Sequence, residues 1–509
     1  MPELKPWQRP RQLWRQLPKP PAVKLPQVSG KLKTWQLTAG AATVGLAISA
    51  GAVAAAGPWD SSGQRTAERE WAASQEAGGG ADHAGRTPGR APGTAPSAPS
   101  VLAGLGAPAG KAPVPTGRAL ADVLDPIMKD PALGPDKAAV VVDAASGKRV
   151  YDKHADKLLT PASTIKIATA VAALSSVGPD HRITTKTVIE PDTKEVVLVG
   201  GGDPTLTARK EGRYTDTAAS LRALAEDTAR ALKARDVDEV TLSYDTSLYS
   251  GPPLHPISPN ENITPVSALM VDEGRLDDSS SGPATRTEDP AGDAVRKFEG
   301  FLKDHGIRTT GQPGPSKASG RAESLAKVES PPLSFLVERM LTHSDNDIAE
   351  HLARQTAIAA EEPASFDGAG KATRAALEKL ELPVGDAEFA DGSGLDRADR
   401  ASALLLTELL DRAADPGHPA LRPVLTGLPI AGFTGTLVDR YPKDSPGTGL
   451  VRAKTGTLTG VNTLSGTVVD ADGRLLVFAF MTTGTTDADG AQKALDHMAS
   501  AVANCGCRA

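Results

Sequence analysis

Apolar residues follow two kinds of spacing along this chain, and each predicts a different element. Ala138–Asp143 is a short apolar run, a turn follows it, and Lys148–Tyr151 starts a returning strand, which together indicate a β-hairpin. A helix is predicted to open at Thr160-Pro161, because proline is favoured at the first helical position. Its continuation, Ile165–Leu174, is apolar almost all round, so this helix is expected to be central and buried.

Between about Ile183 and Lys327 the pattern becomes an alternation of short elements. Short β-like runs alternate there with helix-like runs and with loops rich in glycine and proline. The β-like runs are Glu195–Val199 and Glu239–Ser243, and the helix-like runs are Thr217–Lys233 and Ala294–His305. This change of pattern predicts an inserted domain at residues 184–327.

Longer helices and strands are predicted again after this insertion. We expect a broken helical region, a strand pair and a closing helix: Ser330–Ala359 with a break at Thr342–Ser344, Gly460–Val469 with Arg474–Thr482, and Ala491–Val502. The predicted fold class is therefore α+β, with a helical cluster and an antiparallel sheet in one domain. That domain is expected to consist of residues 118–183 and 328–509, on either side of the insertion.

The N-terminal part contains one long uncharged run, Leu37–Gly57. At a rise of about 1.5 Å per residue it can just span a hydrocarbon core of about 30 Å. Tryptophans flank it, and residues 1–34 hold eight basic groups and one acidic group. We therefore expect a cytoplasmic basic tail at 1–34, a single-pass membrane anchor at 35–57 and an extracellular remainder. The alternative is a signal peptide, cleaved near Ala52-Val53-Ala54, whose removal would leave a secreted protein.

Residues 58–117 have the composition of a linker. Of these 60 residues, 41 are Gly, Ala, Pro, Ser or Thr. Such a composition cannot bury enough apolar surface to fold, so we expect a disordered tether.

Charge and cysteine content narrow the classes of function. Beyond residue 34 the chain has 48 basic and 61 acidic groups, a net charge of −13, which argues against a nucleic-acid-binding core. Cys505 and Cys507 are the only cysteines in the sequence, which excludes a disulfide scaffold, a four-cysteine zinc module and an iron–sulfur protein. The pair could form a strained disulfide or link two chains.

Three short clusters contain candidate chemistry. Lys166 lies three positions after Ser163 at the start of the apolar helix, so the two share one face, and the lysine amine could accept the serine proton. In Ser344-Asp345-Asn346 a hydroxyl and an amide could shuttle a proton and hold a peptide. Lys454-Thr455-Gly456-Thr457 opens a strand, where the lysine and threonines could hold a substrate carboxylate.

Each cluster also has a plain structural reading. The serine and lysine of the first cluster could be ordinary surface residues, Ser344-Asp345-Asn346 could be a helix cap, and Lys454 could be a solvated lysine at a strand start. Asp347 and His351 have helical spacing that could suit a metal, but the sequence contains no HExxH or other zinc pattern. We therefore predict neither a metal nor a cofactor.

In this order, Ser-x-x-Lys, Ser-Asp-Asn and Lys-Thr-Gly form the signature of the penicillin-interacting serine enzymes. Over about residues 118–503 the chain resembles the D-alanyl-D-alanine carboxypeptidase/endopeptidase family typified by penicillin-binding protein 4. Segments similar to that family also occur at Gly200–Thr205, at Asp391–Leu395, and at Gly435–Leu437 with Arg440. The 177 residues between the first two motifs fit its inserted domain. Asp396 departs from the small hydroxyl residue expected after DGSGL.

The resemblance implies a β-lactamase/transpeptidase-like catalytic domain split by the insertion. It also implies acyl transfer from D-Ala-D-Ala stem peptides of peptidoglycan, with inhibition by β-lactams. Ser163 is the expected nucleophile, Lys166 the expected base and Ser344 a third catalytic residue; the expected substrate-binding residues are Asn346, Lys454, Thr455 and Thr457. Backbone N–H groups of Ser163 and Thr457 are expected to form the oxyanion hole. Burial and repulsion between the two lysines should lower the pKa of Lys166.

Two alternatives remain at this stage. A β-lactamase of class A would need a glutamate between the second and third motifs, and Glu378, Glu381 and Glu388 lie there without an identifying context. A catalytically silent wall-binding protein is the other alternative, although all three motifs are intact.

Overall fold

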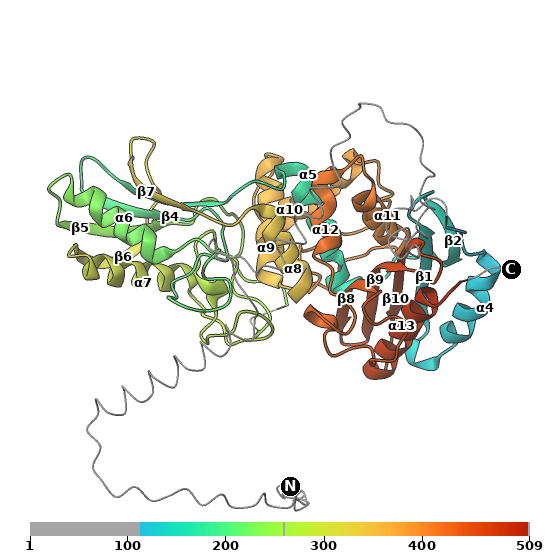
Figure 1. Ribbon diagram of the computed structural model, residues 1–509. Helices are drawn as coiled ribbons and strands as arrows, with labels where there is room; N and C mark the ends of the chain where they lie inside the picture. Colours follow the sequence, from blue (N-terminus) through green and yellow to red (C-terminus); the bar gives the residue numbers. More distant parts are fainter. Residues whose placement is uncertain (1–111, 258–259, 507–509) are drawn as a thin grey trace, which may run out of the picture. The chain divides into compact units, whose positions relative to one another are not determined.

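The computed structural model describes residues 112–257 and 260–506 (Figure 1). The predicted basic tail, the predicted anchor at 35–57 and the predicted linker up to residue 111 lie outside the described residues. The described part contains two five-stranded sheets with helices packed on them, which confirms the predicted α+β class. Its helices are all too short or too polar to cross a membrane.

The first sheet is antiparallel throughout and has the strand order β2-β1-β10-β9-β8. Its strands are β1 (Asp136–Asp143), β2 (Lys148–Lys153), β8 (Arg452–Leu458), β9 (Val461–Val469) and β10 (Leu475–Thr483). The predicted hairpin is therefore β1–β2, and the predicted C-terminal strand pair is β9–β10. Strand β1 pairs with β10, so the first strand lies beside the last one.

Both faces of this sheet are covered, which explains why β1 and β10 contain apolar runs without alternation. Val140 of β1 and Ala479 of β10 belong to a core that they share with the helices of the middle of the chain. Val141 and Phe478, the next residue of β1 and the preceding residue of β10, belong to a second core with the first and last helices. Cys505 joins this second core and is disulfide-bonded, whereas Cys507 lies outside the described residues.

The second sheet is mixed and has the order β6-β5-β4-β3-β7. Its strands are β3 (Thr184–Ile189), β4 (Glu195–Val199), β5 (Glu239–Asp245), β6 (Arg308–Pro315) and β7 (Glu323–Glu329). Strands β4, β5 and β6 run parallel, and helices of this segment follow β4 and β5 as crossover connections. These two helices and the sheet enclose a separate hydrophobic core.

Ten α-helices lie in the described residues: α4 (Gly117–Met128), α5 (Lys166–Val177), α6 (Leu221–Lys233), α7 (Pro290–Asp304), α8 (Leu333–His343), α9 (Asn346–Ala359), α10 (Phe366–Lys379), α11 (Ala403–Ala414), α12 (Arg422–Thr426) and α13 (Ala488–Ala503). Helix α6 begins four residues later than predicted, because the Ser220 hydroxyl caps it by accepting the N–H of Ala223. Helix α7 begins four residues earlier, where Asp289 caps it and Pro290 occupies the first position.

Candidate active site

Ser163 lies in a short 3₁₀ turn, η3 (Ala162–Ile165), and Lys166 is the first residue of α5. The sequence predicted one helix opening at Thr160-Pro161. The α-helix instead begins at Lys166, directly after the 3₁₀ turn, and Ala162 at the start of this turn has a φ of +48°, outside the right-handed helical region. The three-residue spacing still brings the two side chains together, and Lys166 Nζ donates to Ser163 Oγ at 3.0 Å.

Lys166 is fully buried, as is most of α5, so the predicted burial of this helix is confirmed. Its Nζ donates further hydrogen bonds to Asn346 Oδ1 at 2.7 Å and to the Ser393 carbonyl oxygen at 2.5 Å. Burial lowers the pKa of Lys166 to about 8, against the opposing attraction of nearby carboxylates, of which Asp391 is the strongest. An amine with this pKa is partly neutral near pH 7 and can accept a proton.

The second motif occupies the break between α8 and α9. Ser344 ends α8 in the left-handed conformation, with a φ of +57°. Asp345 then caps α9, because its carboxylate accepts the N–H of Ile348 at 3.0 Å. The cap and the proposed chemistry therefore coexist: Asp345 starts the helix, while Ser344 and Asn346 line a cavity.

Lys454 of the third motif is also fully buried and lies beneath the cavity surface. Its Nζ donates to Ser344 Oγ and to the Thr455 carbonyl oxygen, each at 2.8 Å. Burial, followed by repulsion from Lys166, lowers the pKa of Lys454 well below its ordinary value. The interaction between the lysines thus perturbs Lys454, whereas burial dominates at Lys166.

Strand β8 presents the two threonines of the third motif to the cavity. Thr455 Oγ1 is 2.8 Å from Thr436 Oγ1, and the side chain of Thr457 is exposed. Between them, a Cβ on Gly456 would lie 2.7 Å from the Pro161 carbonyl oxygen and 2.1 Å from Thr463 Oγ1. The glycine therefore allows β8 to pack against the nucleophile turn and its neighbouring strand.

Ser163, Ser344, Asn346, Thr455 and Thr457 line one cavity of about 370 Å³. The structure therefore brings five of the seven predicted site residues to a common surface, with Lys166 and Lys454 buried behind it. The cavity wall also contains polar residues that the sequence did not identify as site residues: Asn262, Arg275, Arg286, His343, Thr436, Arg440 and Gln492. Asp345 is the one carboxylate among its described lining residues.

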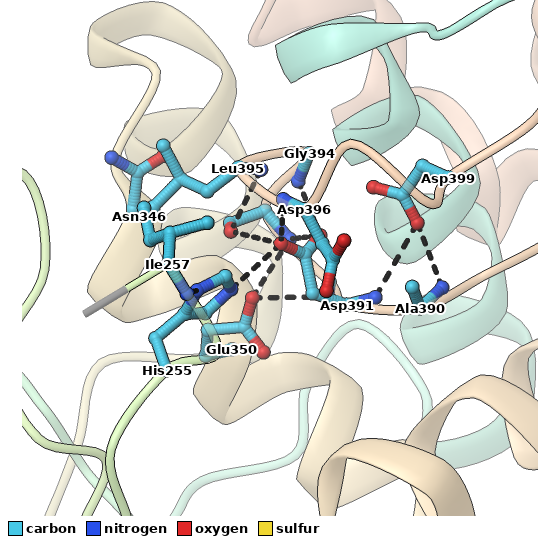
Figure 2. A network of polar contacts seen from close by, with 12 residues as sticks. His255, Ile257, Asn346, Glu350, Ala390, Asp391, Gly394, Leu395, Asp396 and Asp399 are labelled. Atoms are coloured by element: carbon cyan, nitrogen blue, oxygen red, sulfur yellow. Dashed lines mark hydrogen bonds and ion pairs between the residues drawn. The ribbon is translucent and has the colours of Figure 1, made fainter.

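A buried turn at 391–394 holds the Ser393 carbonyl that accepts from Lys166 Nζ. Figure 2 shows the contacts of the Asp391 carboxylate in this turn. The Asp391 carboxylate accepts backbone N–H groups of Ser393, Gly394 and Asp396 at 3.0, 2.5 and 2.7 Å. His255, from the loop after β5, points toward the same carboxylate, with its Nε2 at 2.8 Å. Burial raises the pKa of Asp391, but the His255 hydrogen bond and these N–H groups outweigh it, and the result is a pKa of about 2.

Two further buried acids support this turn. Glu350 of α9 accepts the N–H groups of Gly392 and Ser393 at 3.1 and 3.0 Å. Asp399 accepts the N–H of Ala390 at 2.7 Å, and burial together with the nearby Asp391 raises the pKa of Asp399 well above its ordinary value. Asp391 is therefore charged at pH 7, whereas the environment of Asp399 shifts that group toward its protonated form.

The glycine after Ser393 fixes the position of the turn. Gly394 has a φ of +80°, and a Cβ there would lie 2.1 Å from the Ala162 carbonyl oxygen. In the sequence, Asp391–Leu395 was recognisable only as a family-like segment, and nothing assigned a role to His255. The DGSG run was the available signal, because acidic and glycine residues at this spacing favour a tight turn. His255 gave no local signal.

The residues considered for a metal have other partners. Asp347 forms an ion pair with Arg286 at 3.0 Å, and His351 Nδ1 lies 2.9 Å from the Gly202 carbonyl oxygen. Although these two residues have helical spacing, they face different neighbours. Two other compact groups contain possible metal ligands: one is His255 with Glu350 and Asp391, and the other is Glu273 with Asp345 and Asp347. Arginines or backbone N–H groups already bind the carboxylates of both groups.

Comparison with known proteins identifies the family. The model of the D-Ala-D-Ala carboxypeptidase 3 (S13) family matches residues 120–284 and 277–505. The chain is 35% identical over 419 residues to carboxypeptidase Rv3627c of Mycobacterium tuberculosis, covering 80% of this chain and 89% of that protein. It belongs to the D-Ala-D-Ala carboxypeptidase 3 family.

Further relatives agree with this assignment. Carboxypeptidase DacB of Mycolicibacterium smegmatis is 36% identical over 408 residues, which cover 78% of this chain and 86% of that protein. Penicillin-binding protein 4 (dacB) from Haemophilus influenzae has the same fold, with a TM-score of 0.60 at 21% identity over 75% of this chain and 97% of that chain. The predicted family, fold and enzyme class are confirmed: this D-Ala-D-Ala carboxypeptidase 3 family member is a serine-type carboxypeptidase.

Proposed function

We propose that Ser163 is the nucleophile of this carboxypeptidase and Lys166 its general base. The observation that carries the proposal is the 3.0 Å hydrogen bond between Lys166 Nζ and Ser163 Oγ, combined with a lysine pKa of about 8. In the acylation step the Ser163 oxygen attacks the carbonyl carbon of the D-Ala-D-Ala peptide bond. Its proton passes to Lys166 as the new C–O bond forms.

Collapse of the tetrahedral intermediate breaks the peptide C–N bond. The leaving amine needs a proton, and Ser344 is the proposed donor, since it lines the cavity and accepts a hydrogen bond from Lys454. The donated proton is replaced from Lys166 or Lys454, so the charge balances. Free D-alanine departs, and water then hydrolyses the ester to restore the Ser163 hydroxyl.

Peptide binding is assigned to the remaining motif residues. The Asn346 side chain would hold the substrate backbone, and the Thr455 and Thr457 hydroxyls would bind the terminal carboxylate, with Lys454 acting beneath them through Ser344. Strand β8 lies at the edge of its sheet, so N–H groups on its free side can donate to a ligand. The Thr457 and Ser163 N–H groups are the proposed oxyanion hole.

The substrate we propose is a peptidoglycan stem peptide, with β-lactams as acylating inhibitors. Penicillin-binding protein 4 of Haemophilus influenzae has been solved in complex with a β-lactam, which supports the proposed inhibition by β-lactams.

We also propose that the enzyme works outside the cell membrane, held by residues 35–57, because a basic flank precedes that uncharged run. Protease added to intact protoplasts should then digest the catalytic part and leave a small N-terminal fragment; a mature N-terminus near residue 55 would contradict the anchor.

The test of the catalytic assignment is labelling with a fluorescent penicillin, followed by peptide mapping. The adduct should be on Ser163, and Ser163→Ala should abolish both labelling and release of D-alanine from an acyl-D-Ala-D-Ala peptide. An adduct on Ser344 or on Ser393 would overturn the assignment.

The lifetime of the adduct tests the alternative of a β-lactamase. Rapid β-lactam turnover without D-alanine release would favour it.

A further inference from the structure

One side chain of the inserted segment reaches the turn that contacts Lys166. His255 lies in the loop after β5, and its imidazole is almost fully buried, with an exposed fraction of 1%. The ring meets the Phe366 ring of α10 edge to face, at a centroid distance of 5.2 Å. Its Nε2 lies 2.8 Å from the Asp391 carboxylate, which has no exposed surface (Figure 2). The segment between the first two motifs therefore contributes to the buried surroundings of the proposed base.

The hydrogen bonds of the Asp391 carboxylate show which nitrogen of His255 carries a proton. Oδ1 accepts the N–H groups of Ser393 and Gly394, while Oδ2 accepts the Ser393 hydroxyl and a further N–H of the turn. These four donors occupy both oxygens, which favours the ionised carboxylate, so the histidine must donate to it from Nε2. The other ring nitrogen, Nδ1, is placed to accept the N–H of Ile257 at 3.3 Å.

The charged groups that face His255 come from two elements. The turn contributes Asp391 and Asp396, and α9 contributes Glu350, which pairs with Arg354 at 3.2 Å. Burial lowers the pKa of His255, but the hydrogen bond to Asp391 and the carboxylates outweigh it, so this pKa lies above its ordinary value. Nε2 carries a proton in the neutral tautomer and in the charged ring, so Asp391 keeps this donor in either state.

Asp391 connects His255 with the proposed base. Among the carboxylates that attract Lys166 it is the strongest, and its turn presents the Ser393 carbonyl oxygen that accepts from Lys166 Nζ at 2.5 Å. A hydrogen-bond donor on Oδ2 offsets part of the negative charge of the carboxylate, so it weakens the attraction between Asp391 and the protonated amine. It also fixes the position of the carboxylate, to which the backbone N–H groups of the turn are bound.

We propose that His255 is a positioning residue for the general base and acts through Asp391. Its hydrogen bond holds the turn beside Lys166 and offsets part of the negative charge that the amine meets, which keeps the amine ready to take the Ser163 proton. The inference rests on the proposed function, in which Lys166 is the base. The inserted segment thus contributes to the chemistry through a residue that is not among the described residues lining the catalytic cavity.

The test is the pH profile of acylation by a fluorescent penicillin. His255→Phe keeps a ring against Phe366 but removes the donor. Asp391 remains ionised through its other donors and attracts the protonated Lys166 more strongly, so the acid limb should move to higher pH by roughly 0.5 to 1 pH unit. Acylation at pH 7 should fall by roughly three- to tenfold, while the rate at the high-pH plateau changes little. Asp391→Asn, which removes the carboxylate, should move the limb in the opposite direction.

Three further variants serve as controls. His255→Gln keeps an N–H donor near the position of Nε2 and should restore the wild-type limb. His418 also hydrogen-bonds to an aspartate, Asp415, at 3.0 Å, but this pair is partly exposed, and His418→Phe should leave the profile unchanged. In the double variant with His255→Phe and Asp391→Asn, the limb should coincide with that of Asp391→Asn alone, because His255 acts through this carboxylate.

Each result supports or overturns the proposal. An acid limb that stays in place in His255→Phe, or a glutamine variant that behaves like the phenylalanine variant, would overturn it. A rate loss that is equal at every pH would assign His255 to folding alone, with the same consequence. Should His255→Phe not fold, NMR of the imidazole nitrogens in the wild-type enzyme decides, since an Nε2 without a proton would exclude the hydrogen bond. Failure of the proposed function looks different: the residual acylation by Lys166→Arg would then keep its acid limb.

Discussion

Lys166 and Lys454 are both completely buried beside the same cavity, yet their surroundings differ. Lys166 is attracted by Asp391, Asp345, Glu350 and Asp399, and its pKa is about 8. For Lys454 the two causes of the shift, burial and Lys166, both act downward, and the pKa falls further. Burial alone would lower the pKa of a lysine so far that the neutral amine would be a weak base. The buried carboxylates raise the pKa of Lys166 again, and this keeps its amine basic enough to take a proton.

The largest effect should come from removing the base. Lys166→Arg preserves a positive charge, but the guanidinium cannot deprotonate and cannot accept the Ser163 proton. Acylation by a fluorescent penicillin should slow by roughly 10²–10⁴-fold, the usual contribution of general base catalysis. Stopped-flow labelling measures the rate, with the melting temperature as a check on folding. Acylation at a near-normal rate would remove Lys166 from the role of base.

A smaller loss is expected at the second lysine. Lys454→Met fills a similar volume but removes the donor to Ser344 Oγ, which lies 2.8 Å from Nζ. The acylation rate should fall by roughly ten- to hundredfold, in line with the loss of one hydrogen bond, and the pH dependence of acylation should keep its form. A loss as large as that of Lys166→Arg would mean that the two lysines share the base function.

The pH profile tests the influence of the carboxylates on Lys166. Acylation by the wild-type enzyme should weaken as the pH falls through about 8, because Lys166 then becomes protonated. Asp391→Asn removes a negative charge that favours the protonated amine. The pKa of Lys166 should therefore fall, and the acid limb of the profile should move to lower pH.

Asp399→Asn is the matched control for Asp391→Asn. Asp399 attracts the protonated Lys166 less strongly than Asp391 does, and an amide preserves the shape of its carboxyl group. The acid limb of the pH profile should therefore move less in this variant than in Asp391→Asn. Equal shifts in the Asp391 and Asp399 variants would show that the turn acts through its structure and not through its charge.

The smallest effect is expected at the position that departs from the family pattern. The Asp396 carboxylate accepts the N–H of Ala398 at 2.8 Å, and a serine hydroxyl can accept the same hydrogen bond. Asp396→Ser should therefore change the acylation rate by less than about threefold, and the acid limb should stay in place. A large change would mean that this carboxylate contributes to the chemistry directly.

The sequence predicted the proximity of the proposed catalytic side chains better than it predicted their environment. Ser163 and Lys166 could be paired from a local spacing, because three residues of helical geometry suffice. The acids that set the pKa of Lys166 are distant in sequence, so local spacing could not predict that they surround it. Asp391, for example, is 225 positions away. The positive φ of Ala162 was also missed; its carbonyl oxygen lies against Gly394, which is distant in sequence.

The same limit applies to the fold. Apolar runs predicted strands β1, β9 and β10, but they could not predict that β1 pairs with β10. Two arginines of the cavity wall, Arg275 and Arg286, escaped prediction for a related reason. Arg275 and Arg286 belong to a loop without regular spacing, and only the backbone bridge between them brings the two charges together.

The pairing of β1 with β10 has a consequence for biosynthesis. Asp136 is opposite Thr483, so the centre of the catalytic sheet closes a loop of nearly the whole catalytic chain. The mixed sheet of residues 184–329 is made from strands that emerge together, and it can form while β8, β9 and β10 are still being synthesised. Until then β1 can pair only with β2. Ser163 lacks the residues of β8 that surround it in the complete structure. The proposed active site can therefore form only after β8, β9 and β10 have been synthesised.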